Sequence, residues 1–225
     1  MHKKSTLQKL AALLCLTISS SVLSQNIDHW ESVIYNTDQW SYFVGFSEPS
    51  NQWTQPSFDA NTWLVDQGGF GYDDGDDNTT IVATSSVYIR KSFNLIDTAV
   101  IQYLILQADY DDAFVAYLNG TEIARNNIGT VGTPPTYDAL ATTFKEAQLY
   151  SGNQPESYSI TPSNFRSFIK QGSNTLAIQI HNQSLTSSDL SSNFFLTLGI
   201  SDNSNNYRST PSWFQAPNLG STLPI

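Results

Sequence analysis

Hydrophobic and polar positions alternate with a period of two over several short stretches of the chain, which is typical of β-strands. In one of these stretches, Leu176, Ile178 and Ile180 fall on one face and the residues between them on the other. Another, residues 99–108, is almost continuously apolar, which indicates a central strand covered on both faces. The strands predicted in this way cover residues 40–46, 86–93, 99–108, 174–182 and 194–200.

A hairpin and one helix are also predicted. Residues 114–125 hold Asn119-Gly120 between two short apolar runs, a strong hairpin signal because both turn positions need positive φ. A short helix follows Thr161, which can cap it. Pro162 fits the first turn, and Phe165, Phe168 and Ile169 form an apolar stripe. Lys170 and Gly172 are signals of the helix end. Together these elements predict an all-β fold, an antiparallel β-sandwich of the jelly-roll kind with one short helix.

The chain divides into three parts. Residues 1–24 place three lysines, an apolar run and small residues in the order of a secretory signal peptide, with cleavage expected near Ser24. The apolar run is too short for a membrane helix, which needs about 20 residues. Residues 25–201 hold the predicted sandwich. Residues 202–225 are rich in Asn, Ser and Pro, which indicates a linker leading toward a further C-terminal domain. We expect the mature protein to be secreted, or held at the cell surface or in the periplasm.

Removal of the signal peptide changes the charge and the cysteine count. The mature chain has no cysteine, and it carries seven basic and twenty acidic residues, a formal charge of −13. Such a surface repels phosphate backbones and anionic lipids, which argues against nucleic-acid and membrane partners. Neutral glycans, cations and other proteins are better partners. Without disulfides, the fold must be stabilised by its core or by metal.

Four stretches, in this order, carry a resemblance to a family. They are "PSFDANTWLVDQGGFGYDDGDD" (56–77), "VYIRKSFNL" (87–95), "ADYDDAFVAYLNGTEIARNN" (108–127) and "FIKQGSNTLAIQIHNQSLTSSDLSSNFFLTL" (168–198). Together they resemble the galactose-binding-domain-like, carbohydrate-binding-module-like jelly rolls of secreted bacterial proteins. The resemblance implies a sandwich fold and an accessory, often carbohydrate-binding, role beside a covalently linked catalytic domain. The ending "NLGSTLPI" is similar to the junction at which a CotH-type domain begins.

The loop "GGFGYDDGDDNTT" (68–80) is the predicted cation site. Hard cations such as calcium take six to eight oxygens, often several carboxylates from one turn. Four aspartates surround Gly75, although their spacing does not follow the EF-hand pattern. A solvated Asp-Gly turn is the alternative. The predicted ligands of a structural calcium ion are Asp73, Asp74, Asp76 and Asp77.

A second acidic group, residues 109–112, ends an apolar strand and therefore lies at an edge of the sandwich. Asp111 and Asp112 can cap that turn, pair with Arg125 across the hairpin, or contact a ligand or cation. If residues 73–77 and 109–112 meet at one rim, they can form a single site. If they lie far apart, both are turns.

A third polar group joins His181, at the end of its strand, to the loop of Asp189. The expected contact is a hydrogen bond between His181 and that loop, or a polar contact to a sugar. A hydrolase using His181 is a further alternative, although no G-x-S-x-G turn or oxyanion hole accompanies it.

Aromatic side chains are numerous, and sugar rings stack on exposed ones. Trp40 and Trp63 are expected in the core. Tyr72 and Tyr110, each beside an acidic group, are the better candidates for exposure and ligand contact. The predicted ligand-binding residues are Tyr72, Tyr110, Asp111, Asp112, Arg125, His181 and Asp189.

These observations favour a non-catalytic, exported β-sandwich that binds carbohydrate and is accessory to an attached domain. Any catalytic domain would lie beyond Ile225. A structural spacer or protein-interaction domain without a glycan ligand is the alternative, and a hydrolase is the third hypothesis. An exposed aromatic platform would favour glycan binding over the spacer, whereas a buried His181 outside any cleft would exclude the hydrolase.

Overall fold

The structure, a computed structural model, describes residues 26–73, 75 and 77–219. The predicted signal peptide, two of the predicted calcium ligands (Asp74 and Asp76) and the last six residues lie outside the described residues.

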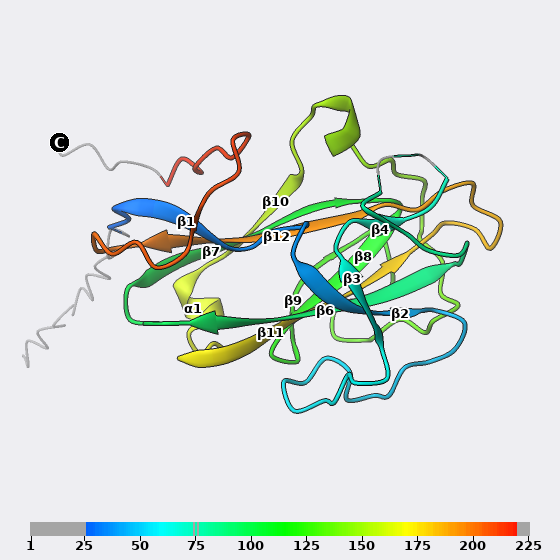
Figure 1. The fold of residues 1–225 in the computed structure, drawn as a ribbon, viewed down its shortest axis with the longest axis horizontal. Helices are drawn as coiled ribbons and strands as arrows, with labels where there is room; N and C mark the ends of the chain where they lie inside the picture. The colour runs from blue at the N-terminus through cyan, green and yellow to red at the C-terminus, as the bar shows by residue number, and fades with distance from the viewer. Residues whose placement is uncertain (1–25, 74, 76, 220–225) are drawn as a thin grey trace, which may run out of the picture.

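Two antiparallel sheets pack face to face, which confirms the predicted all-β class and β-sandwich (Figure 1). Sheet A has the order β10 (Glu156–Ile160), β7 (Ile101–Tyr110), β12 (Ser192–Ile200), β1 (His29–Ile34) and β13 (Arg208–Ser209). Sheet B has the order β3 (Leu64–Gln67), β2 (Gln39–Val44), β6 (Ser86–Leu95), β11 (Gly172–His181), β8 (Ala113–Leu118) and β9 (Thr121–Asn126). The short strands β4 (Phe70–Gly71) and β5 (Thr79–Thr80) pair in parallel.

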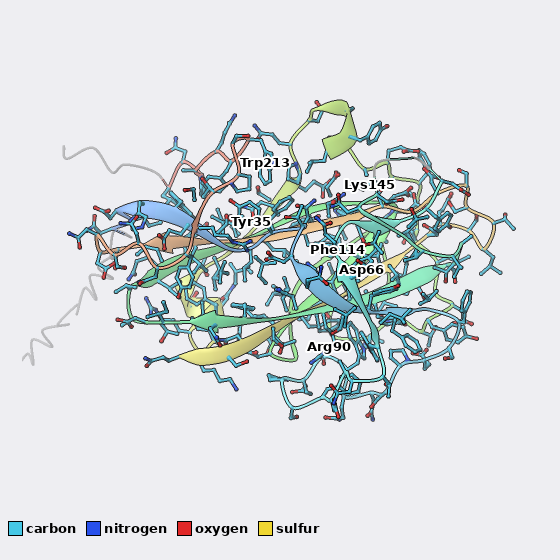
Figure 2. All side chains as sticks on the ribbon, in the orientation of Figure 1. Tyr35, Asp66, Arg90, Phe114, Lys145 and Trp213 are labelled. Atoms are coloured by element: carbon cyan, nitrogen blue, oxygen red, sulfur yellow. The ribbon has the colours of Figure 1, made fainter. Side chains whose placement is uncertain are left out.

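The main core lies between the sheets, because alternate residues of each strand point inward. Phe114 of β8 shows the packing: its ring lies 5.4 Å from that of Phe194 in β12 of the opposite sheet, edge to face. Figure 2 shows Phe114 between the two layers. The strand β7 is buried along nearly its whole length, as predicted for residues 99–108.

The hairpin between β8 and β9 confirms the Asn-Gly prediction. Asn119 and Gly120 have φ values of 52° and 83°, the positive values that a tight two-residue hairpin requires. The Asn119 side chain also donates to the Phe168 carbonyl and accepts from the Thr175 amide, both at 2.8 Å. The turn is therefore fixed to the neighbouring strand and to the segment after the helix.

Other elements differ from the prediction. The helix α1 (Pro162–Phe165) is shorter than predicted, and the chain continues from it as a turn. The predicted loop 126–156 contains only the 3-10 turn η1 (Leu149–Ser151) before β10 begins at Glu156. Strands β1, β3, β10 and β13 were not predicted from the pattern. They are short or lie at or next to a sheet edge, where alternation is weak.

Part of the predicted linker packs on sheet A. Arg208 of β13 donates to both carboxylate oxygens of Asp38 at 2.6 Å. Trp213 packs edge to face on Phe195 with ring centroids 5.0 Å apart, on the outer side of sheet A (Figure 2). These contacts hold residues 207–214 against the sandwich.

Candidate functional site

The outer face of sheet B, which points away from the main core, carries large aromatic and polar side chains. The strand register aligns Tyr88 of β6 with Gln179 of β11, and Arg90 of β6 with Ala177 of β11 and Tyr117 of β8. Because Ala177 is small, it leaves a space between the larger side chains on either side. This face is the base of a second apolar cluster, separate from the main core.

The loop 46–63 fills that space with Trp53. Its indole meets the rings of Tyr88 and Tyr117 edge to face, with centroids 5.1 and 5.7 Å away. It also stacks on Trp63 at 6.2 Å, with an angle of 25° between the planes. Trp63 is buried, as predicted, but in this second cluster. The interlocked rings fix the loop on the sheet, and therefore fix the walls of the space beside it.

A cavity of about 420 Å³ lies beside Trp53, and we call it the aromatic cavity. It is lined by Glu48, Pro49, Asn51, Trp53, Thr54, Tyr88, Tyr117, Gly120, Pro134, Pro135 and Thr136. Its base is aromatic, whereas its rim offers a carboxylate, an amide and hydroxyl groups. Glu48 at the rim accepts a hydrogen bond from the Tyr137 amide at 2.9 Å, which joins the two loops that form the walls. Such a mixture of ring faces and a few polar groups is typical of small-molecule sites.

The hydroxyl of Tyr88 has no hydrogen-bond partner among the described residues, although the residue is only 1% exposed. Burial raises the pKa of this phenol above its usual value, so the hydroxyl stays protonated at neutral pH. An unpaired buried hydroxyl costs free energy unless a ligand or water pairs with it. The wall of the aromatic cavity therefore contains a polar group without a hydrogen-bond partner among the described residues.

A second cavity of about 310 Å³ lies on the same face, lined in part by Phe58, Trp63 and Arg90. The Arg90 guanidinium donates to the carbonyl oxygens of Trp53 and Gln55, and it lies 5.1 Å from the centre of the Phe58 ring. Burial without a carboxylate partner lowers the pKa of Arg90 to about 10. Figure 2 shows Arg90 on the outer side of sheet B, where it attaches the loop 46–63 to the strands.

His181 is fully buried on this outer face and lines neither of these two cavities. Its Nδ1 lies 2.9 Å from the Ala139 carbonyl and its Nε2 lies 3.3 Å from Gln179. The predicted hydrogen bond to the Asp189 loop is therefore wrong. Burial lowers the pKa of His181 to about 4, so the imidazole is neutral at pH 7. A buried, neutral histidine that lines neither of these cavities does not fit the catalytic base of a hydrolase.

The predicted exposure of Tyr72 and Tyr110 is wrong: they are 3% and 0% exposed. The Tyr72 hydroxyl donates to the Thr84 carbonyl and accepts from Asn182, and the Tyr110 hydroxyl donates to Glu156. Neighbouring aspartates did not indicate exposure, because both rings point into the core while the acidic side chains occupy the turns beside them.

Arg125 also has a different role from the predicted pairing with Asp111 or Asp112. It forms a two-contact ion pair with Glu122, three residues away on β9, with both distances 2.9 Å. It also donates to the carbonyls of Ile128 and Thr133, while Glu122 accepts from the Gly132 amide. The pair thus clamps the loop that leads to the Pro134 and Pro135 wall of the aromatic cavity.

Two aspartates of the second acidic group anchor loops. Asp112 accepts from the amides of Lys145 and Gln183 at 2.6 and 2.7 Å. Asp109 accepts from the amides of Gln148 and Leu149 at 2.7 and 3.0 Å, although burial raises the pKa of its carboxyl. These bonds hold the long loop 127–155 and the loop 182–191 against the end of the sandwich.

Asp111 lies between these anchors, and its carboxylate approaches Glu146 and Asp189, with the nearest oxygens of the three all within 4.8 Å of one another. We call these three residues the acidic rim. Asp111 is 2% exposed, and its Oδ1 has no hydrogen-bond partner among the described residues. Burial, followed by the Asp112 carboxyl, raises the pKa of Asp111 to about 9.

One residue of the first acidic loop lies close to the loop that carries Asp189. A Cβ placed on Gly71 would overlap both the Asp77 Oδ1 and the Leu190 carbonyl, so Asp77 lies beside the residue after Asp189. The Tyr72 amide also donates to the Leu190 carbonyl at 3.1 Å. Asp73 is exposed and has a positive φ of 70°. Among the described residues of the first acidic loop, Asp77 therefore lies beside the loop that carries Asp189, while the calcium prediction at residues 73–77 stays a prediction.

Sequence reasoning missed Trp53, Tyr88, Tyr117 and Glu146 as site residues. The signal for the aromatic cavity was present: Tyr88 and Tyr117 alternate with core residues in adjacent strands, so both faces of sheet B carry bulky side chains. Glu146 had no such signal, because it is brought to the rim by tertiary contacts such as the hydrogen bond from the Lys145 amide to Asp112.

No protein-family model matches the sequence, and no curated protein matches it significantly. Solved structures that are similar include the calcium-binding mutant of Bacteroides uniformis β-glucuronidase 2, with TM-score 0.46, 14% identity, and coverage of 76% of this chain and 18% of that one. A β-glucuronidase from glycoside hydrolase family 2 has a TM-score of 0.46 and 16% identity, and the match covers 75% of this chain and 18% of that one. The β-glucuronidase of an uncultured Clostridium species has a TM-score of 0.45 and 12% identity, and the match covers 76% of this chain and 29% of that one.

The chain therefore spans less than a third of the length of these proteins, and the similarity assigns neither a family nor an activity. The comparisons give no support to a junction with a CotH-type domain. Among the described residues, no helix is both long enough and apolar enough to cross a membrane.

Proposed function

We propose that this domain is a non-catalytic carbohydrate-binding module, and that the aromatic cavity on sheet B holds one or two sugar units. The unpaired Tyr88 hydroxyl beside the Trp53 ring is the observation that carries the proposal. A sugar presents C–H faces that pack on aromatic rings, and hydroxyl groups that pair with an isolated phenol. In this proposal the module is exported and tethers an attached domain to an extracellular glycan.

The chemistry of the cavity favours a neutral sugar. Glu48 and the net negative charge of the chain repel anionic ligands, while Asn51, Thr54 and Thr136 offer both donors and acceptors. The volume of about 420 Å³ lies within the range of small-ligand sites. The predicted calcium ion at residues 73–77 is not needed for this binding and belongs to the proposal only as a structural element.

The Tyr88→Phe variant tests the proposal. Removing the hydroxyl should lower the affinity for a bound glycan roughly 10-fold, the value of about one hydrogen bond. The free energy of unfolding should stay the same or rise by about 1 kcal/mol, because a buried unpaired group is removed. Binding would be found on an array of neutral oligosaccharides and measured by titration calorimetry, and stability by urea unfolding.

Two further variants separate cavity binding from surface binding. Asn51→Trp places bulk at the exposed rim and should block the cavity, whereas Asn153→Trp places the same bulk on a distant exposed loop and should bind like the wild type. Tyr150→Phe, which removes an exposed phenol, is the control for Tyr88→Phe. The proposal would be refuted if the protein binds no glycan, or if Tyr88→Phe and Asn51→Trp both bind glycan as tightly as the wild type. Either result would leave the spacer or protein-interaction role.

A further inference from the structure

The acidic rim has features that internal hydrogen bonding does not explain. Three carboxylates from three separate segments converge: Asp111 follows β7, Glu146 lies in the loop 127–155, and Asp189 lies in the loop 182–191. Like charges this close repel one another strongly, and burial of Asp111 increases the cost. The arrangement therefore needs either a positive charge or a proton.

Neither Asp111 nor Asp189 forms an ion pair with a Lys, Arg or His in the described part of the chain. The nearby ammonium of Lys145 pairs with Glu156 at 3.6 Å and lies 4.0 Å from the centre of the Tyr110 ring. In the described part of the chain, the Asp111 Oδ1 is a buried polar atom of the rim without a hydrogen-bond partner.

The convergence is built by hydrogen bonds from the residues next to each carboxylate. Asp112 holds the amide of Lys145, which places Glu146, and the Asp111 amide donates to the Ser191 carbonyl at 3.1 Å, which places Asp189. The rim is thus preorganised by its neighbours, while the Asp111 Oδ1 is left free. Glu146 is exposed and Asp189 half-buried, so the rim opens to solvent.

We propose that Asp111, Glu146 and Asp189 bind a calcium ion that joins these two loops to the end of β7. Carboxylate oxygens are the ligands of hard cations, and a set without His or Cys disfavours zinc. Oxygens within 4.8 Å of one another are close enough to share one cation. Calcium accepts flexible coordination by loop carboxylates, whereas magnesium demands near-ideal octahedral geometry and gives up its waters reluctantly.

The site is distinct from the loop that the sequence indicated for calcium, and the test separates them. The mature protein would be treated with a chelator, and its melting temperature measured with added calcium, magnesium or zinc. Calcium at about 100 times its Kd should raise the melting temperature by roughly 5–10 °C. Terbium should replace calcium and show emission sensitised by nearby tyrosines such as Tyr72, and calcium should compete it away.

The variants Asp111→Asn and Asp189→Asn should each abolish the calcium-dependent rise and the terbium signal. Without metal, Asp111→Asn should melt at about the same temperature as the wild type, because burial already favours the uncharged form of the Asp111 side chain. Asp189→Asn lies in a half-buried loop, so it keeps the test decisive if Asp111→Asn fails to fold. The exposed Asp66→Asn on β3 is the matched control and should respond like the wild type.

Three results would overturn the proposal. Calcium could leave the melting temperature and the terbium emission unchanged, which would mean that Asp111 carries a proton instead. Both rim variants could keep the full response. Finally, Asp73→Asn could abolish the response while Asp111→Asn retains it, which would place the ion in the loop 73–77.

Discussion

At the scale of single residues, burial changes the chemistry of several polar groups. His181, Asp111 and Tyr88 are each at most 2% exposed, and each has a pKa moved toward its neutral form, mainly by the loss of water. The three differ in their partners. His181 has polar neighbours at both ring nitrogens, whereas Tyr88 and one oxygen of Asp111 lack a partner among the described residues. A buried polar group with hydrogen-bond partners in the protein indicates a structural role, whereas one without such partners indicates a place where a ligand can bind.

The pKa of His181 predicts a pH-dependent stability. Its pKa is about 4 in the folded protein and 6.5 as a model value for the unfolded chain. Between these values the unfolded chain binds more protons, so the free energy of unfolding falls as the pH drops from 6.5 to 4. The difference amounts to about 3 kcal/mol, all of which is present above pH 6.5.

Urea unfolding of the wild type and His181→Gln at about pH 7 and about pH 4.5 would measure this effect. The variant should lose clearly less stability than the wild type over that interval, since both share the titration of the remaining acids. Equal losses in the two proteins would show that His181 binds its proton equally well in the folded and the unfolded state.

At the scale of elements, the β8–β9 hairpin forms part of the aromatic cavity. Gly120 lines the cavity, and a Cβ placed on it would overlap the Gln55 side chain. Gln55 in turn provides a carbonyl that accepts from Arg90. The hairpin tip, the loop 46–63 and strand β6 are therefore coupled by contact.

The variant Gly120→Ala should lower the free energy of unfolding by about 1–2 kcal/mol, because a side chain at positive φ is strained and the end of the Gln55 side chain must move to make room. It should also weaken glycan binding. Gly132→Ala is a matched control, since Gly132 has a φ of 80° but no atom within 4 Å of the added Cβ. Denaturant unfolding and calorimetry of both variants would test this, and equal effects would contradict the coupling.

Elements governed by local chemistry could be predicted from the sequence. Asn119-Gly120 defines its own turn, and the apolar run at 99–108 needs no partner to indicate a central strand. Strands β10 and β13 could not be predicted, because Tyr158 and Arg208 pair only with strands distant in sequence. The same reason applies to the sites. Asp111 and Asp189 stood out by composition, but Glu146 reaches them only through the tertiary fold, and the orientation of Tyr72 and Tyr110 depends on which face of the chain the core covers.

At the scale of the whole molecule, the segment after Ser201 closes one edge of sheet A. Besides the contacts of Arg208 and Trp213, the nearly buried Glu31 carboxylate accepts from the amides of Asn206 and Tyr207 at 3.2 and 3.1 Å. Phe214 covers Trp30 with ring centroids 5.5 Å apart. Residues 206–214 thus contribute to the sandwich both by covering apolar rings and by satisfying a buried charge.

Removal of residues 202–225 should therefore lower the free energy of unfolding by on the order of 3 kcal/mol, from exposed aromatic surface and an unpaired carboxylate. A chain that ends at Phe214 retains these contacts and should lose much less. Thermal and urea unfolding of the two truncated proteins would decide between them. If both unfold alike, the segment contributes no stability.

The position of Trp53 also makes the protein its own optical reporter. The indole lies in the wall of the aromatic cavity, whereas Trp30 and Trp213 pack on the opposite sheet. A sugar that displaces water beside Trp53 should shift its fluorescence without any attached dye, and removing Trp30 or Trp213 should leave that shift in place. Occupancy of the cavity could then be followed in real time, in the presence or absence of calcium, on the unmodified chain.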